Sequence, residues 1–364
     1  MAFDDVLGHE RIRGLLSRAL DTGRVPHALL FAGPEGVGKR TLALAFAAAL
    51  LCEARGAQGA CGACRHCLRL VRAVDSLDDF RSGAEKSYRG PEDAALFNFR
   101  LHPDLLLVEP PTRGGRRAEI LAPQAEDVVR ETFKPPFEAR ARVFVIDDAH
   151  ALCAGTAVTA ANALLKSLEE PPARAHFVLV TAQPQSLLAT IRSRCQTLRF
   201  GPLSLAALQD RLRREGLPES EARLRAALSG GSLGAARAFD SEAWRAQREG
   251  LVALLETAPR LDPLGRLKAA ETLKEMDDVR GGLTTLRTLL RDVAALQAGG
   301  DGATLLNGDL GARLLVVARG PLGRQAAALG EAAAVARDAL AGYAHEQLTL
   351  DDFVERLAGE SVAS

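Results

Sequence analysis

Short apolar runs alternate with amphipathic segments along the first part of the chain. Three continuous apolar runs predict buried strands: 27–33, 142–150 and 175–182. Apolar positions at helical spacing predict helices at 39–52 and 159–170, and Pro171 ends the second of them. Strands that alternate with helices form parallel sheets with both faces covered, so residues 1–200 predict an α/β domain.

The pattern changes after Phe200, where no further strand is predicted. Residues 201–240 contain short helical segments broken by Gly-Leu-Pro and Gly-Gly-Ser, which predicts a small helical domain. From 241 to 364 the apolar positions keep a helical period, clearest at 282–297, and predict a helix bundle. The stretch 74–101 is polar, mixed in charge and interrupted by Gly and Pro, which predicts a mobile surface insertion.

Composition narrows the class of protein. Apolar residues make up 47% of the chain and charged residues 25%, as in soluble globular proteins. Lys plus Arg equals Asp plus Glu at 46 each, which argues against a general electrostatic attraction to nucleic acid and leaves a local basic patch open. No apolar run is long enough to predict a membrane span, and the acidic first residues lack a signal-peptide core. We therefore expect a cytoplasmic protein.

The segment 33–41, GPEGVGKRT, is close to a phosphate-binding loop. Four of its residues are expected to surround a bound phosphate: Gly33, Gly36, Gly38 and Lys39. The hydroxyl residue that would hold magnesium is replaced by Arg40, which brings its own cation to that place. Thr41 lies about 100° further around the helix and cannot simply substitute for that hydroxyl. Its backbone N–H is still among those expected to surround a phosphate, so Thr41 remains a candidate residue of the degenerate nucleotide site.

Two aspartates follow the second predicted strand. Asp147 is placed to bind magnesium, directly or through water. ATPases of this kind carry Glu at the next position, and Asp148 is shorter by one C–C bond, about 1.5 Å. That retraction is enough to lose the positioning of a water molecule. The alternative is that both are solvated residues at the end of a strand.

Four closely spaced cysteines are the most specific chemical motif in the sequence. They form the pattern C-x8-C-x2-C-x2-C and comprise Cys52, Cys61, Cys64 and Cys67. Four thiolates complete a tetrahedral shell, which predicts a structural zinc ion. Free buried cysteines and an iron–sulfur cluster are the alternatives. Cys153 and Cys195 are isolated, and we expect no chemistry from them.

Together these segments resemble a bacterial clamp-loader subunit of the AAA+ class. The motifs that carry the resemblance are FDDVLGHE (3–10), HALLFAGPEGVGK (27–39), the cysteine pattern, HPDLLLVEP (102–110), VFVIDDAH (143–150), AANALLKSLEEPP (160–172) and TIRSRCQTLRF (190–200). The resemblance implies an AAA+ domain over 1–200 with a zinc module at 52–67, a helical lid over 201–240 and an oligomerising collar over 241–364. It also implies a five-subunit loader with tau/gamma and delta subunits, which opens the sliding clamp and places it on primer-template DNA.

Such loaders contain ATP-hydrolysing motor subunits and non-motor stators. The resemblance makes Arg194, in the Ser-Arg-Cys motif, a trans arginine finger for a neighbour's ATP site, and it matches Thr181 to a polar sensor. A tau/gamma-type motor needs Ser or Thr in place of Arg40, Glu in place of Asp148 and a lid arginine in place of Gly234. These three differences favour a stator with weak or absent ATP or ADP binding and ATPase activity. An active motor and an AAA+ protein unrelated to replication are the alternatives.

Overall fold

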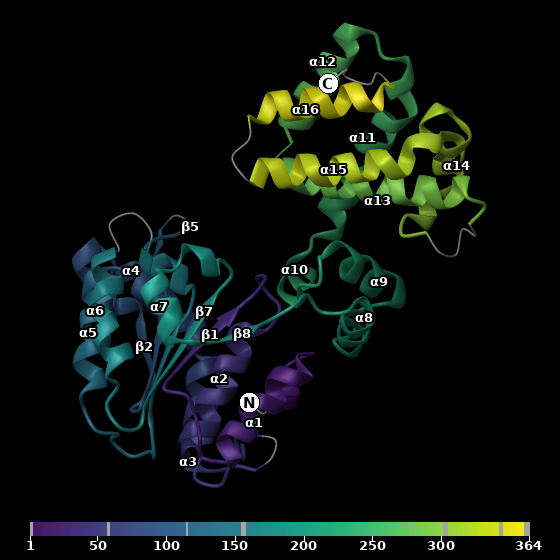
Figure 1. Cartoon of the computed structure of the whole chain (residues 1–364). Coiled ribbons are helices and arrows are strands. Elements are labelled where there is room, and N and C mark those ends of the chain that lie inside the picture. The colour runs from purple at the N-terminus through teal and green to yellow at the C-terminus, as the bar shows by residue number, and fades with distance from the viewer. Residues whose placement is uncertain are drawn as a thin grey trace. The chain divides into compact units, whose positions relative to one another are not determined.

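The computed structural model describes residues 3–56, 59–113, 116–153, 158–276, 278–300, 305–341 and 345–359. The chain divides into two compact units, which are Met1–Arg214 with Gly230–Ala235 and Glu215–Ser229 with Ala236–Ser364 (Figure 1). The stretch 201–240 is thus shared between the units, and the three-domain division stays a prediction. Within the part of the chain that the structure describes, no helix has the length and apolar character needed to span a membrane.

A six-stranded sheet forms the centre of the first unit. Its strands are β1 (Ala28–Ala32), β2 (Asn98–His102), β3 (Leu105–Val108), β6 (Arg142–Ile146), β7 (Ala175–Thr181) and β8 (Gln196–Arg199). Their order is β2-β3-β6-β7-β1-β8, and every neighbouring pair is parallel except β2 with β3. A separate two-stranded hairpin joins β4 (Thr112–Arg113) and β5 (Arg116–Arg117). The three predicted strands are confirmed as β1, β6 and β7.

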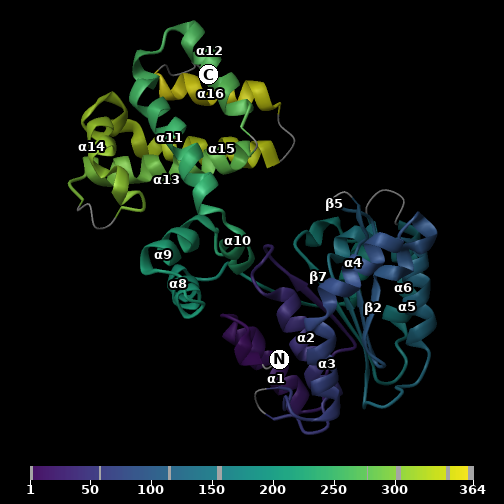
Figure 2. The same cartoon turned by 180° about the vertical axis from the view of Figure 1, so that it is seen from behind.

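Helices cover both faces of this sheet (Figures 1 and 2). One face carries α1 (Glu10–Asp21), α2 (Lys39–Leu51), α3 (Arg65–Asp75) and α4 (Leu77–Ser87), and the other carries α5 (Ala122–Thr132), α6 (Val158–Glu169) and α7 (Ala189–Arg194). Alternation along β1 sends Leu29 and Phe31 into the first core, and Ala28 and Leu30 into the second. The predicted α/β fold class, with helices on both faces of a mainly parallel sheet, is confirmed.

The structure corrects the prediction of a mobile surface insertion at 74–101. This stretch forms α4, a 3-10 helix at Pro91–Phe97 and most of the edge strand β2. Five of its apolar side chains, Leu77, Ala84, Phe97, Phe99 and Leu101, are buried in the core beneath α2, whereas Phe80 and Leu96 are exposed. The polar residues that dominate its composition occupy the exposed side, so composition concealed the few buried positions that fold the segment.

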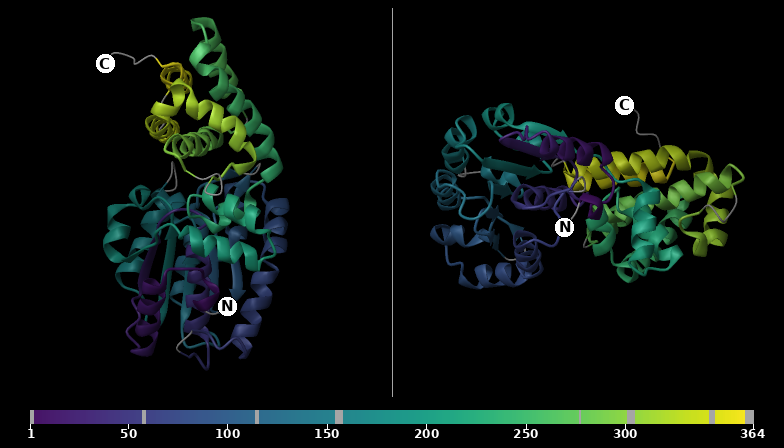
Figure 3. Two further views of the ribbon diagram at one scale, coloured as in Figure 1. Left: turned by 90° about the vertical axis from the view of Figure 1, so that its right-hand side faces the viewer. Right: turned by 90° about the horizontal axis from the view of Figure 1, so that it is seen from below.

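The second unit is helical throughout its described residues (Figure 3). Its helices are α9 (Glu219–Leu228), α11 (Ser241–Thr257), α12 (Pro263–Lys274), α13 (Val279–Gln297), α14 (Gly311–Arg319), α15 (Ala326–Ala341) and α16 (Glu346–Leu357). The aspartates Asp240, Asp262 and Asp278 accept backbone hydrogen bonds at the starts of α11, α12 and α13. The remaining helices are α8 (Leu205–Arg214) in the first unit and α10 (Leu233–Ala238). The predicted helix at 282–297 lies within α13.

Candidate functional site

The phosphate loop connects β1 to α2 in the predicted strand–loop–helix arrangement. Gly33, Gly36 and Gly38 all have positive φ angles, of 155°, 68° and 102°. A Cβ atom on Gly33 would lie 2.2 Å from the carbonyl oxygen of Phe200, and one on Gly36 would lie 2.2 Å from Oγ of Ser232. Glycine is favoured at both positions because each has a positive φ angle and lies against a close neighbour, the backbone of Phe200 or the side chain of Ser232.

The side chain of Lys39, the first residue of α2, folds back and contacts the phosphate loop. Its Nζ donates to the carbonyl oxygens of Gly33 at 2.7 Å and Pro34 at 2.5 Å. Burial lowers the pKa of Lys39, and the nearby carboxylates of Asp147 and Glu35 oppose that shift. The ammonium that would contact a phosphate is therefore satisfied by the loop itself.

The start of α10 lies directly against the loop. The backbone N–H of Gly234 donates to the carbonyl oxygen of Gly36 at 3.0 Å. Gly234 stands where a motor subunit of the resembled class carries an arginine. The segment therefore brings a backbone hydrogen bond to the loop at Gly36 in place of a cationic side chain.

An arginine occupies the position expected for magnesium. Nη2 of Arg40 lies 2.5 Å from Oε1 of Glu109, and its Nη1 lies 3.5 Å from Oδ2 of Asp147. Arg81, from α4, contacts both carboxylate oxygens of Glu109 at 2.7 Å. Two guanidinium groups thus balance two buried carboxylates beside the phosphate loop. Thr41, the other candidate residue at the start of α2, is exposed.

Asp147 and Asp148 have different environments. Asp147 directly follows β6 and is buried, whereas Asp148 has a left-handed backbone with φ of 46°. Asp148 lines a cavity of about 610 Å³ whose wall includes two further acidic residues, Glu35 and Glu119.

Thr181 is fully buried at the end of β7, beside the phosphate loop. Its carbonyl oxygen accepts the N–H of Gly33 at 3.2 Å, and its Oγ1 lies 3.3 Å from Nδ1 of His150. The predicted Gly33, Lys39, Asp147 and Thr181 therefore meet at the carboxyl edge of the parallel strands, where ligands bind in open α/β sheets. The neighbouring Glu109 and Arg81 were missed by sequence reasoning.

The four predicted cysteines converge in one cluster beyond the end of α2. Their sulfur atoms all lie within 4.8 Å of one another, with Cys64 3.4 Å from Cys67 and 3.9 Å from Cys52. A tetrahedral zinc ion with bonds of about 2.3 Å requires sulfur separations of about 3.8 Å. The cluster can therefore hold a metal ion.

Local backbone groups favour the thiolate of Cys61, whereas burial raises the pKa of Cys52 and of Cys67. The N–H of Cys64 donates to Sγ of Cys61 at 3.3 Å, and the N–H of Cys61 donates to Sγ of Cys52 at 3.3 Å. Backbone N–H groups of Ala63 and Cys64 lower the pKa of Cys61 to about 6. Burial raises the pKa of Cys195 to about 12 and also raises that of Cys153, in keeping with their expected inertness.

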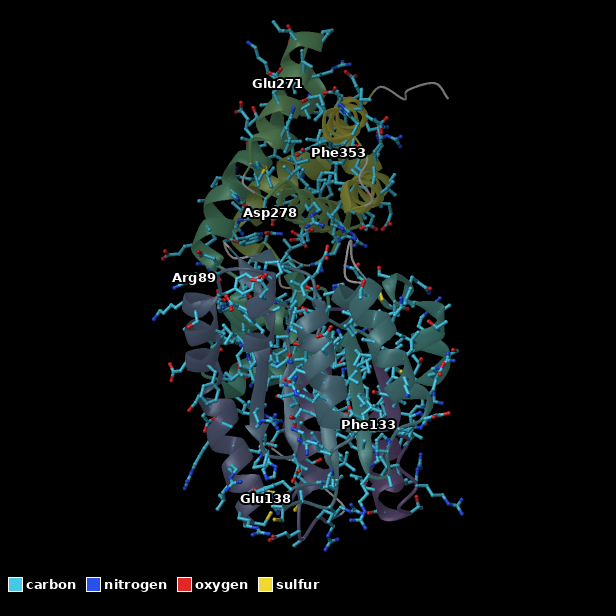
Figure 4. All side chains as sticks on the ribbon, turned by 90° about the vertical axis from the view of Figure 1, so that its left-hand side faces the viewer. Arg89, Phe133, Glu138, Glu271, Asp278 and Phe353 are labelled. Atoms are coloured by element: carbon cyan, nitrogen blue, oxygen red, sulfur yellow. The ribbon has the colours of Figure 1, made fainter. Side chains whose placement is uncertain are left out.

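A histidine pair lies beside the cysteines, at the end of the unit where Figure 4 labels Glu138. Nδ1 of His66 lies 2.8 Å from Nε2 of His102. The N–H of Asp104 donates to Nδ1 of His102 at 3.0 Å, so the neutral His102 ring carries its proton on Nε2. Burial and nearby His66 lower the pKa of His102 to about 4, which keeps the ring neutral. This Nε2 lies between Nδ1 of His66 and, at 3.2 Å, Oε1 of Glu138.

Arg194 is the last residue of α7, on the opposite sheet face from α2. Its Nη1 donates to the carbonyl oxygen of Thr190 at 2.9 Å, and its Nη2 forms an ion pair with Glu169 at the end of α6. The side chain is about one third exposed, at 32%. Cys195 is buried beneath it and anchors the end of α7 in the second core.

The mainly parallel sheet, the phosphate loop after β1 and the polar residues after β6 and β7 define an AAA+ type P-loop protein. Residues 8–204 match the family described as "DNA polymerase III, delta subunit". The chain is 32% identical to DNA polymerase III subunit delta' of Bacillus subtilis over 295 residues, 80% of this chain and 78% of that protein. It is 34% identical to the delta' subunit of Pseudomonas aeruginosa over 247 residues, 65% and 64% of the two chains. The chain belongs to the delta-prime family of DNA polymerase III subunits.

A second group of relatives is named DNA polymerase III subunit gamma/tau or tau. The chain is 31% identical to DNA polymerase III subunit gamma/tau of Mycobacterium tuberculosis (strain H37Rv) over 216 residues, 58% of this chain. The match spans only 31% of that protein. The percentage identity is alike for both groups, but the delta' match to Bacillus subtilis spans more of both chains.

Proposed function

We propose that this chain is a non-motor, or stator, subunit of the DNA polymerase III clamp loader. The observation that carries the proposal is the ion-pair network in which Arg40 contacts both Glu109 and Asp147. The guanidinium group takes the place that magnesium needs between the phosphate loop and Asp147. Metal-dependent ATP hydrolysis then lacks its metal ion.

Two further features support a weak or silent nucleotide site. Asp148 is one methylene shorter than a catalytic glutamate, and it lines a cavity together with Glu35 and Glu119. Gly234 offers a backbone N–H to the loop where a motor would offer a guanidinium. An active motor would require other residues to bind the metal ion, to position the water molecule and to supply the lid arginine.

In the proposed stator, the chemistry of this chain takes place in the ATP site of a neighbouring subunit. Arg194 supports this role because it ends a helix on the sheet face opposite α2, and its side chain is partly exposed. A guanidinium that reaches a neighbour's γ-phosphate stabilises the charge of the transition state, and such fingers contribute about 10³–10⁵ in rate where measured.

The rest of the proposal concerns the setting of this subunit. The cysteine cluster would hold one structural zinc ion that fixes the end of α2 to the start of α3. The partners are tau/gamma and delta subunits in the cytoplasm, with the sliding clamp and primer-template DNA reached through the complex. The helices of the second unit would form the oligomerising collar.

A nucleotide titration of the isolated chain, with and without Mg²⁺, tests the stator role. We expect no measurable ATP hydrolysis and no gain in nucleotide affinity from Mg²⁺, because Arg40 occupies the metal position. Lys39→Ala is the matched control for any turnover that is seen. Magnesium-dependent turnover that Lys39→Ala abolishes would instead establish an active motor.

A further inference from the structure

Glu169 holds the guanidinium of Arg194 within the chain. The carboxylate pairs with Nη2, while Nη1 is held by the carbonyl oxygen of Thr190 at 2.9 Å and by Oγ of Ser193 at 3.3 Å. Both terminal nitrogens therefore have fixed partners on two different helices, α6 and α7. These contacts select one orientation from the many that a flexible arginine can adopt.

The helix-end positions of Glu169 and Arg194 mean that each residue stabilises the other. Glu169 is the last residue of the helix, where the negative end of the helix dipole disfavours a carboxylate. Arg194 is likewise the last residue of α7, where a cation is favoured. The arginine offsets the unfavourable placement of the glutamate, and the glutamate in turn fixes the arginine.

The ion pair between Glu169 and Arg194 is strong enough to orient the guanidinium. It is also weak enough for the guanidinium to exchange Glu169 for a phosphate. The side chains of Arg194 and Glu169 are 32% and 45% exposed. Ion pairs with this degree of exposure shift an equilibrium by about two- to fivefold at most. A γ-phosphate carries more negative charge and lies in a subunit interface that excludes water, so it competes successfully for the same guanidinium.

We propose that Glu169 is a positioning residue for Arg194, holding its guanidinium ready for the ATP of the neighbouring subunit. The proposal rests on the trans role of Arg194 proposed above. Glu169 itself touches neither nucleotide nor reacting atoms. Its contribution is to reduce the conformational freedom that Arg194 would otherwise lose when it reaches the phosphate.

The test measures ATP hydrolysis by the loader reconstituted with Glu169→Ala in this chain. We expect kcat to fall about two- to fivefold, with KM for ATP unchanged, because orientation matters for the transition state. Glu169→Gln keeps one acceptor oxygen and should lose less. Glu170→Ala, at the exposed neighbouring glutamate, is the matched control and should retain the full rate.

A double-mutant cycle separates positioning from general damage. If Glu169 acts through Arg194, Glu169→Ala will have no further effect in an Arg194→Ala background. An equal loss in both backgrounds, an unchanged rate or a faster rate for Glu169→Ala would overturn the inference. If Arg194→Ala alone leaves the rate unchanged, the trans finger fails first, so the two failures are distinguishable.

Discussion

Replacement of Arg40 by threonine is predicted to destabilise the first unit. Arg40 is 24% exposed, while the carboxylates that it contacts, Glu109 and Asp147, are 9% and 8% exposed. Breaking a fully buried ion pair costs about 3–5 kcal/mol, but Arg81 still neutralises Glu109 in the variant. We therefore expect the free energy of unfolding to fall by about 1–3 kcal/mol, the range for a buried polar group that loses its partner, because Arg81 offsets part of the charge.

Urea unfolding followed by circular dichroism measures this loss. Trp244, the only tryptophan of the sequence, belongs to the second unit, so its fluorescence should report an unchanged transition there and serve as an internal control. Arg40→Lys keeps the charge but lacks the planar fork that contacts both carboxylates, and it should lose less stability. Mg²⁺ should stabilise Arg40→Thr and not the original chain. A variant as stable as the original, with no response to Mg²⁺, would refute the reasoning.

Three further predictions concern the cysteines, the stretch 74–101 and the buried histidine. Elemental analysis should find one zinc ion per chain. The zinc should be lost in Cys64→Ser and retained in His66→Ala. A chain that contains no metal and has free thiols would contradict the zinc site. Gly83→Ala should raise the free energy of unfolding by about 0.5–1 kcal/mol in urea titrations, because Gly83 lies in α4 and an added Cβ has no neighbour within 4 Å. An unchanged free energy of unfolding would contradict a helix at this position. His102 titrates at about 4 in the fold and near 6.5 when unfolded, so the unfolded chain binds the extra proton between these values. Stability should therefore be complete above pH 6.5 and fall as the pH drops toward 4, with a flatter slope in His102→Asn; equal slopes would contradict the assigned burial effect.

The sequence was informative where the determining residues are close together in the chain. Continuous apolar runs predicted β1, β6 and β7, and the spacing of the cysteines predicted their convergence. The edge strand β8 was missed because only Leu198 among its four residues is buried, which leaves no continuous apolar run.

The candidate site was only partly predictable. The unusual Arg40 was visible in the phosphate-loop pattern, but its partner Glu109 was not, because the two come from different elements of the sheet domain. Arg81 was assigned to a surface insertion, although folding of α4 brings it onto Glu109. Such long-range charge pairs leave no local pattern in one sequence, since their spacing is set by the packing of the whole unit.

ATP hydrolysis by the reconstituted clamp loader carrying Arg194→Ala tests the central claim most directly. The matched control is Arg192→Ala, which removes a nearby arginine of α7 whose Nη1 contacts Gln185 at 2.6 Å. We predict that Arg194→Ala leaves folding and assembly intact and sharply lowers the hydrolysis rate, while Arg192→Ala retains it. An unchanged rate in the Arg194→Ala loader would contradict the account of this chain as a stator that acts in a neighbour's site.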